Sequence, residues 1–387
     1  MGALDGLKVI DLTQMYAGPG TGMLLSDQGA DVIKIEPPNG GRDRTVDGGG
    51  TADTFLLLNR GKRSLILDLR TEQGKEVLRR LAARSDVMLV AWPPGQAEKL
   101  GCGYEAMHAL NPRLVYASIT GWGETGPLAQ WPGYDRLHQA HTGMMDRNRG
   151  PDGAPLVLPF FAADQAIPFA LCYGIMLALW QRERTGLGQK VETSQLDLMI
   201  AIQSLRLVFR EDDTGPRREE FPGHIYLTKD DRWITLVPIL DSEWARLWDC
   251  LGLADLAADE RLRRPAGRLE HDGLIRARLA ERFREKTLAE WLALTEPAGL
   301  PVAAVHTGAE FIDHPHAWQN GMLAERQHPV HGRVRMMNTP VRLSDSNGEA
   351  GWPPPGFGEH SREILAELGF DEADIAAMER DGVTGQH

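Results

Sequence analysis

The sequence has 387 residues, of which 42% are hydrophobic and 25% are charged, and it carries a formal net charge of −12. These values are typical of a globular protein with a sizeable core and two or three domains. The acidic balance argues against nucleic-acid partners and against binding to anionic membranes, so an anionic ligand would need a local basic cluster.

The cysteines and the N-terminus indicate a compartment. Cys102, Cys172 and Cys250 are widely spaced and odd in number, so they predict neither a disulfide framework nor a CxxC metal site. Residues 1–5 lack the basic-then-apolar order of a signal peptide, and no uncharged apolar run reaches about 18 residues. We therefore expect a cytoplasmic protein without a membrane span.

The N-terminal residues alternate between strand and helix patterns. Residues 7–12 predict a short apolar strand, and residues 31–36 predict a second one that Pro37 ends. Between them, the glycine-rich residues 17–22 lead into a short helix at 23–27, which completes a β-α-β unit. The glycine spacing matches a dinucleotide fingerprint poorly, although such a loop can present backbone N–H groups to an anion.

The alternation continues through the first half of the chain. An amphipathic helix is predicted at 71–83, and a long apolar helix runs from about Asp164 to Gly186. The pattern predicts an open, doubly wound α/β domain with a Rossmann-like sheet. The further strands are expected at residues 65–69, 86–90, 114–119 and 189–193, and one more helix at 196–207.

A basic cluster precedes the third strand. Arg60, Lys62 and Arg63 lie beside Gly61, and three cations next to a glycine make a plausible phosphate clamp. A solvated basic turn is the ordinary alternative for such a charge run.

A second domain is predicted after a linker at residues 212–216. It begins with a hairpin (225–227 and 233–237) and closes with a strand at 301–305. Its helices are expected at 243–250, 273–284 and 288–294. Beyond it, the sequence predicts strands within 332–343, a turn-rich strap at 351–356, and helices at 361–368 and 372–380.

Three acids in residues 133–164 have distinct settings: Asp135, Asp152 and Asp164. Asp152 lies between proline and glycine residues, which mark a loop, and reactive side chains often lie on loops. A free aspartate titrates near pH ~4, so its carboxylate needs no separate base to attack an activated carbonyl. Pro-Asp-Gly is also ordinary turn chemistry, so both interpretations stay open.

Histidine pairs do not predict a metal site. His138 and His141 are separated by two residues, and the pairs at 314/316 and 328/331 are equally loose. None has the HExxH pattern or cysteine company of a persuasive zinc site. The sequence also lacks a G-x-S-x-G elbow and a Walker A loop.

Several motifs occur in a fixed order along almost the whole chain. They are residues 4–13 (LDGLKVIDLT) with 17–19 (AGP), 29–38 (GADVIKIEPP), 59–64 (NRGKRS), 110–116 (LNPRLVY), 182–186 (RERTG) and 358–360 (GEH). Together they resemble the family III CoA-transferases, a group that includes formyl-CoA transferase and the α-methylacyl-CoA racemases.

The resemblance implies an architecture. It implies a large CoA-binding domain from residues 1–210, a small α+β domain from 222–310, and a C-terminal segment, 325–387, that returns to the large domain. The functional unit would be an interlocked homodimer. Acyl-CoA and a small carboxylic acid would be the substrates, with no tightly bound cofactor and no metal.

The resemblance also implies site residues. Asp152 becomes the candidate nucleophile, which forms a mixed anhydride with the donor acyl group and then an aspartyl-CoA thioester. The predicted CoA-binding residues are Tyr16, Ala17, Arg60, Lys62, Arg63, Trp92, Lys99, Trp122 and Tyr134.

Two alternatives to the transferase remain. In the racemases a histidine precedes the first acid and works with a second acid, which here is Asp164. Tyr134 stands at the histidine position, and tyrosine titrates near ~10, which makes it a poor proton shuttle. Asp164 is then either an alternative acid/base or a structural cap. The other alternative is a CoA-binding protein without catalysis.

Departures from the family bear on the substrate. Residues 91–95 read AWPPG where the family has Asn-Phe-Arg-Pro-Gly, although Lys99 matches a family arginine that contacts CoA phosphate. Tyr16 and Trp122 differ from formyl-CoA transferase, whose tetraglycine loop has no counterpart near Pro222-Gly223-His224. These differences argue against oxalate and formyl-CoA as the substrate pair.

Overall fold

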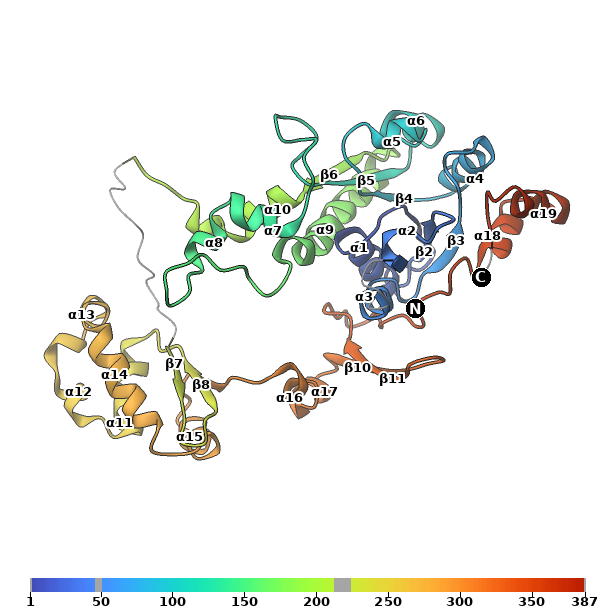
Figure 1. Cartoon of the computed structure of the whole chain (residues 1–387). Helices are drawn as coiled ribbons and strands as arrows, with labels where there is room; N and C mark the ends of the chain where they lie inside the picture. The colour runs from blue at the N-terminus through green and yellow to red at the C-terminus, as the bar shows by residue number, and fades with distance from the viewer. Residues whose placement is uncertain (1, 46–50, 212–223, 386–387) are drawn as a thin grey trace. The chain divides into compact units, whose positions relative to one another are not determined.

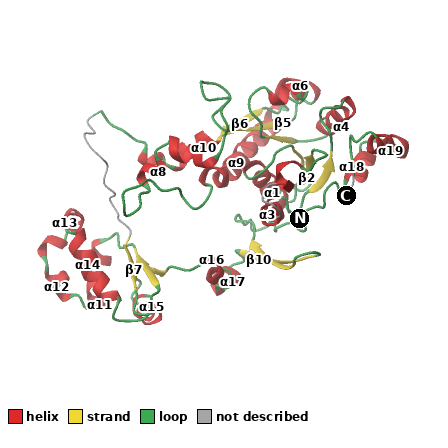
Figure 2. Ribbon diagram, in the orientation of Figure 1, coloured by secondary structure: helices red, strands yellow, loops and turns green. Residues whose placement is uncertain are grey.

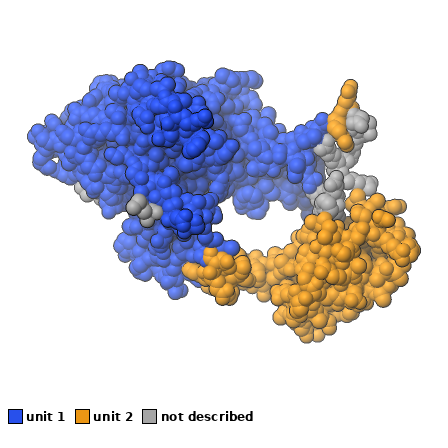
Figure 3. Space-filling model, turned by 180° about the vertical axis from the view of Figure 1, so that it is seen from behind, with its two compact units in different colours: residues 1–209, 321–387 blue, residues 210–320 orange. Residues whose placement is uncertain are grey.

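The computed structural model describes residues 2–45, 51–211 and 224–385. The chain divides into two compact units, coloured separately in Figure 3. Unit 1 comprises Met1–Phe209 and Gly321–His387, and unit 2 comprises Arg210–Asn320. Unit 1 therefore contains both chain ends. The linker predicted at 212–216 and the loop at Pro222-Gly223 lie outside the described residues.

A parallel six-stranded sheet forms the centre of unit 1 (Figure 1). The spatial order is β3-β2-β1-β4-β5-β6, so the order reverses between β1 and β4. In open α/β sheets, ligands bind at such a reversal, outside the carboxyl ends of the strands. The strands are β1 (Lys8–Asp11), β2 (Asp31–Glu36), β3 (Arg63–Ile66), β4 (Val87–Val90), β5 (Val115–Thr120) and β6 (Lys190–Ser194).

Side chains that alternate along the strands build two hydrophobic cores, one on each face of the sheet. Ile10, Ile33 and Met88 belong to one core, and their neighbours Val9 and Val32 belong to the other. The first face is covered by α4 (Glu72–Ala82), α6 (Tyr104–Leu110), α18 (Ser361–Glu367) and α19 (Glu372–Arg380). The second face is covered by α1 (Ala17–Asp27), α9 (Ala162–Thr185) and α10 (Gln195–Ile202) (Figure 1).

The C-terminal segment packs onto the edge strand β3. Ser361 Oγ accepts a hydrogen bond from the backbone N–H of Ile66 (3.2 Å), and Thr384 Oγ1 donates to the Ile66 carbonyl (2.7 Å). A hairpin of β10 (Leu323–His328) and β11 (Gly332–Met337) precedes this segment. The sequence predicted strands within 332–343 but not β10.

The glycine-rich residues 17–22 are helical, which corrects the predicted loop. The helix α1 begins at Ala17 and includes these glycines. Because glycine has no side chain, neighbouring residues can pack directly against the helix backbone. A Cβ atom on Gly18 would lie 2.2 Å from Thr13 Cβ, and one on Gly20 would lie 2.8 Å from Pro168 Cγ. Glycine weakens a helix intrinsically, so the tertiary contacts decide this element.

The long apolar helix α9 has 24 residues and is apolar enough to cross a membrane by length and composition alone. One face packs into the sheet core through Ile167, Leu171 and Ile175. Near its end the buried Arg182 binds Asp86 at 3.0 Å. The core helix of a soluble protein passes the same composition test, so α9 is weak evidence for a membrane span.

Several short helices of unit 1 were not predicted. Two of them, α2 (Gly41–Thr45) and α7 (Asp135–His141), contribute to the site below. The others are α3 (Thr51–Leu58), α5 (Gln96–Lys99), α6 and α8 (Met144–Arg147); the helix predicted at 196–207 is present as α10 and the 3₁₀ turn η1 (Ser204–Arg206).

Unit 2 is an α+β unit with its own core (Figure 2). A three-stranded antiparallel sheet, in the order β7-β8-β9, includes the predicted hairpin. Trp291 and Phe283 are buried in this core, and the Thr287–Glu290 capping box starts one of its helices. Its elements are β7 (His224–Leu227), β8 (Trp233–Leu236), β9 (Val302–Ala304), α11 (Asp241–Leu251), α12 (Ala254–Ala258), η2 (Glu260–Leu262), α13 (Pro265–Glu270), α14 (Asp272–Phe283), α15 (Leu288–Thr295), α16 (Gly308–Phe311) and α17 (Pro315–Gln319).

Candidate active site

Helices α1 and α9 lie side by side with their N-termini at the same end. The rings of Tyr16 and Phe161, which directly precede the two helices, are 5.0 Å apart between centroids. Farther along, Cys172 Sγ contacts the Thr21 carbonyl at 3.8 Å. Since the N-terminus of a helix carries unpaired N–H groups and a partial positive charge, this end of unit 1 favours anions.

Asp135 fixes the start of α9. Its carboxylate is 2% exposed, and Oδ2 accepts hydrogen bonds from the N–H groups of Ala163 (2.7 Å) and Asp164 (3.3 Å). Oδ1 accepts from Gln139 Nε2 at 2.6 Å. The side chain of Asp135 therefore caps α9 from the neighbouring helix α7, and its own oxygens are occupied.

Asp164 lies in the first turn of α9 and is half-buried. Its Oδ1 accepts a hydrogen bond from Gln195 Nε2 at 2.7 Å. Loss of hydration raises the pKa of Asp164 to about 6; the Gln195 hydrogen bond opposes this shift and the nearby Asp135 adds to it. Perturbed carboxylates of this kind cluster at functional sites.

Two glycines leave the space in which Gln195 contacts Asp164. The loop after β5 and the segment before α7 meet at Gly121 and Gly133, and a Cβ atom on Gly133 would lie 2.5 Å from Gly121 Cα. The same Cβ would lie 2.9 Å from Gln195 Oε1. Any larger side chain at Gly133 would thus displace the amide that holds Asp164.

The loop between β1 and α1 is held by buried charges. Met15 has a left-handed backbone (φ 72°), and its N–H donates to Asp43 Oδ1. Asp43 in turn pairs with Lys34 at 2.6 Å, and Lys34 Nζ also donates to the Thr13 carbonyl. These contacts fix the residue before Tyr16, in a conformation that costs energy for a non-glycine residue.

Tyr134 and Trp122 lie around α7. The Tyr134 side chain is 51% exposed, and Arg42 Nη2 donates to its hydroxyl at 3.4 Å. Trp122 is instead buried, stacks on His138 with 4.2 Å between ring centroids, and donates to the Pro132 carbonyl. Burial lowers the pKa of His138, so this histidine is neutral at pH 7.

Asp152 lies in an exposed turn. Its Oδ1 accepts a hydrogen bond from the N–H of Ala154 at 3.0 Å, and the Gly150 carbonyl accepts from Gly153 N–H at 2.9 Å. This is local turn geometry, which the sequence analysis weighed as the alternative to a nucleophile. Nothing within the described residues shields its carboxylate from water.

Arg60 and Lys62 of the predicted phosphate clamp are buried and paired within unit 1. Arg60 is fully buried, where it binds Asp27 (Nη2–Oδ2 2.6 Å) and donates to the Met337 carbonyl. Lys62 Nζ binds Asp11 (2.7 Å) and the Pro19 carbonyl, and burial lowers its pKa to about 8 against the attraction of Asp11. Their donors face protein groups, so these two side chains stabilise the fold.

Arg63 is likewise engaged within unit 1. It forms two hydrogen bonds to Asp31 and also pairs with Glu363 and Glu367 of α18. Its role in the structure is to bind the C-terminal helix to the sheet edge.

Trp92 and Lys99 lie at a different part of the sheet edge. Trp92 helps line a hollow at the carboxyl ends of β4 and β5, and Lys99 is exposed on α5. Lys190 and Glu124 form an ion pair in this hollow. Trp92 and Lys99 stay predicted CoA contacts. The remaining lining residues include Glu98, Tyr104, Tyr116, Ser118 and Thr120.

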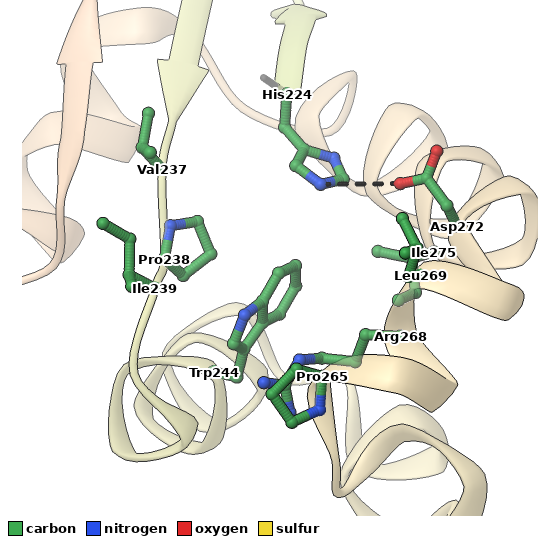
Figure 4. Close-up of a pocket in the computed structure, with 10 residues that line it drawn as sticks. All are labelled: His224, Val237, Pro238, Ile239, Trp244, Pro265, Arg268, Leu269, Asp272 and Ile275. Atoms are coloured by element: carbon green, nitrogen blue, oxygen red, sulfur yellow. Dashed lines mark ion pairs between the residues drawn. The ribbon is translucent and has the colours of Figure 1, made fainter. Parts of the chain in front are cut away.

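Unit 2 has a separate pocket, which contains none of the predicted contacts (Figure 4). His224 faces Asp272 across it at 3.6 Å, and burial lowers the His224 pKa to about 4, so the ring is neutral at pH 7. Arg268 binds Asp241 at 2.6 Å as well as the Leu262 carbonyl. Because these polar groups have partners within unit 2, the pocket is a weaker candidate than the end of α9.

The structure thus brings together Tyr16, Ala17, Tyr134 and Asp164 of the predicted residues. Asp135, Gln195 and Arg42 were not predicted as site residues from the sequence. Asp164 could be predicted from the sequence because it is an acidic residue in the first turn of a long apolar helix. No local signal identifies Gln195, because its contact depends on two glycines far away in the sequence.

Comparisons with known proteins identify the family of this chain. The model of CoA-transferase family III matches residues 4–361. A probable fatty acyl-CoA transferase of Mycobacterium tuberculosis is 32% identical, with 94% of this chain and 97% of the relative covered. Succinyl-CoA:glutarate CoA-transferase of Mus musculus is 32% identical, with 100% and 91% covered.

A solved structure supports the same relationship. The crystal structure of a CaiB/BaiF family protein from Brucella suis superposes with a TM-score of 0.83 at 34% identity, covering 95% of this chain and 99% of that one. The match extends over both units and over the segment that contains Asp135 and Asp164. This chain belongs to CoA-transferase family III.

Proposed function

We propose that this protein moves CoA from an acyl-CoA donor to a carboxylic acid through a covalent intermediate on Asp164. The observation that carries the proposal is the half-buried Asp164 carboxylate, whose pKa is raised to about 6 where two helix N-termini meet. Such a carboxylate is still mostly ionised at pH 7. It is also poorly hydrated, which makes it a stronger nucleophile than a solvated carboxylate.

This proposal replaces Asp152, the nucleophile expected from the sequence, with Asp164. An aspartyl anhydride or thioester must be kept from water, and Asp152 lies in an exposed turn. Asp164 is instead half-buried, and its carboxylate is oriented by Gln195. The racemase alternative uses the same acid but lacks its histidine, because Tyr134 stands there.

The reaction proceeds in balanced steps. Asp164 attacks the donor thioester carbonyl, and CoA leaves as the thiolate while a mixed anhydride forms. The thiolate then attacks the aspartyl carbonyl, which releases the donor acid and gives aspartyl-CoA. The acceptor carboxylate repeats these two steps in reverse, so Asp164 is regenerated and the thioester free energy is conserved.

The N-terminus of α1 supplies the electrostatic stabilisation, because Asp135 already caps α9. Each addition step places negative charge on a carbonyl oxygen, and the first N–H groups of α1, at Ala17 and Gly18, have no intrahelical partner. We propose that they bind this oxyanion. Tyr16 and Tyr134 would line the acyl site, and Trp92 and Lys99 would contact CoA farther along the sheet edge.

Mass spectrometry tests the proposal. The intact protein is mixed with a panel of acyl-CoAs that includes succinyl-CoA, beside the Asp164→Ala and Asp152→Ala variants. We expect a CoA-sized covalent adduct on the native chain and on Asp152→Ala, removed by a free carboxylic acid, and no adduct on Asp164→Ala.

Other outcomes distinguish the alternatives. An adduct that is lost only in Asp152→Ala would restore the assignment made from the sequence. Solvent deuterium at the α-carbon of a 2-methylacyl-CoA, without an adduct, would indicate a racemase. Tight CoA binding with neither reaction would indicate a non-catalytic binding protein.

We further propose that the functional unit is a homodimer, in line with the family. Phe169, Tyr173, Leu177 and Trp180 form a stripe on α9 that is at least half exposed. Their spacing places them on one face of the helix, opposite the face in the core. An exposed apolar stripe of this size is typical of a protein interface, and a second copy would cover it.

Charges on this stripe are expected to separate the copies. The double variant Tyr173→Glu/Trp180→Glu should shift the mass measured by light scattering from two chains to one, because buried unpaired carboxylates oppose association. Val330→Glu, an exposed site on the β10–β11 hairpin, serves as the control and should stay at two chains. Native protein with the mass of one chain would contradict the proposal.

A further inference from the structure

Two arginines near Asp164 have no acidic partner among the residues that the structure describes. Arg42 Nη2 contacts only a hydroxyl, that of Tyr134, at 3.4 Å. The Arg136 guanidinium lies over the Phe161 ring, 5.8 Å from its centroid. Both side chains are exposed. By contrast Arg44, two residues beyond Arg42, binds Glu36 with two hydrogen bonds.

These arginines are connected to the reactive carboxylate by short contacts. Arg136 follows Asp135, whose carboxylate holds the N–H groups of Ala163 and Asp164. Its ring contact, Phe161, lies three residues before Asp164 and also packs against Tyr16. Arg42 contacts Tyr134, which directly precedes Asp135.

Unpaired guanidinium groups indicate a ligand with an anionic group. A guanidinium group binds a carboxylate with two parallel hydrogen bonds. The chain has a net charge of −12, so acidic partners for arginine are abundant, and two arginines without one in the described part of the chain are unusual. The acceptor acid uses one carboxylate to form the new thioester. A second carboxylate, a few carbon atoms away, would lie toward the arginines.

We propose that Arg136 and Arg42 form a subsite for the second carboxylate of a short dicarboxylic acid, which makes such acids the preferred acceptors. This inference rests on the proposed CoA transfer and adds the substrate class to it. The relatives differ in class, since one is named for fatty acyl-CoA and others for succinyl-CoA with glutarate or mesaconate. The arginines favour the dicarboxylic acids.

Paired acceptors of equal length test the subsite. Transfer from one acyl-CoA donor to glutarate and to pentanoate is measured for native protein and for Arg136→Met and Arg42→Met. We expect each variant to lower kcat/KM for glutarate by about 10- to 100-fold, the range for a lost charge-assisted hydrogen bond. The value for pentanoate should change by less than about threefold, since pentanoate lacks the second carboxylate.

Two further variants sharpen the result. Arg136→Lys keeps the charge but not the two-pronged geometry, so its glutarate loss should be intermediate. Arg79→Met removes a guanidinium from the surface of α4, where Arg79 pairs with Glu76, and should change neither acceptor.

The outcomes are separable from those of the proposed function. Equal losses for glutarate and pentanoate, or no loss in any variant, would overturn the subsite while leaving CoA transfer intact. A native preference for pentanoate would do the same. Absence of transfer from every donor to every acid would instead overturn the CoA transfer on which the subsite rests.

Discussion

Replacing Asp164 by asparagine is expected to lower kcat/KM for CoA transfer by at least ~10³-fold, the scale of losing a covalent nucleophile. In the native protein, kcat/KM should fall below pH 6 with the uptake of one proton, because the Asp164 pKa is raised to about 6 and only the carboxylate attacks. Steady-state kinetics between pH 4.5 and 8.5 measure both effects.

The same substitution is expected to stabilise the protein. The Asp164 pKa is about 6 in the folded chain against 3.8 as the ordinary value, so the folded state holds its proton more tightly. Its ionisation therefore costs stability, a cost that is absent below about pH 4 and complete above about pH 6. Asp164→Asn should raise the free energy of unfolding at pH 8 by about 1–2 kcal/mol and show no advantage at pH 4.

Asp152→Asn is the matched control for Asp164→Asn. The side chain of Asp152 is exposed, so we expect only a small change in rate. A large loss of rate in Asp152→Asn, with Asp164→Asn active, would contradict the assignment of the nucleophile.

Replacing Arg60 by methionine is expected to lower the free energy of unfolding by about 3–5 kcal/mol. The substitution leaves Asp27 charged and buried without its two hydrogen bonds from Arg60, and it removes the bond to the Met337 carbonyl. Urea-induced unfolding followed by circular dichroism measures the effect. Combining it with Asp27→Leu should restore part of the loss, since no unpaired charge then remains.

This variant also decides between fold and ligand roles for Arg60. If Arg60 bound a CoA phosphate, the methionine variant would lose CoA affinity and keep its stability, which is the opposite of our expectation. Arg70→Met is the matched control, because Arg70 is exposed and, among the residues that the structure describes, pairs with Asp68 alone. Its unfolding midpoint should match that of the native protein.

The sequence by itself determined the order along the chain of the six strands of the parallel sheet and of the helices α4 and α9, because apolar runs and their spacing encode local structure. It also determined the family, since motifs from residues 4–13 to 358–360 occur in order. The acid that we propose as nucleophile was already visible as a carboxylate in the first turn of a long helix. These features depend on residues that are close together in the chain.

Only the tertiary structure decided which charged residues are available to a ligand. Arg60, Lys62 and Arg63 read as a basic cluster, but their partners Asp27, Asp11 and Asp31 come from other segments and bind them inside unit 1. Conversely, Asp164 acquires its raised pKa from burial. The exposure of a side chain and its ion-pair partners depend on residues that are distant in the sequence. The same arginines and lysine therefore predict a binding site from the sequence but form a stabilising network in the fold.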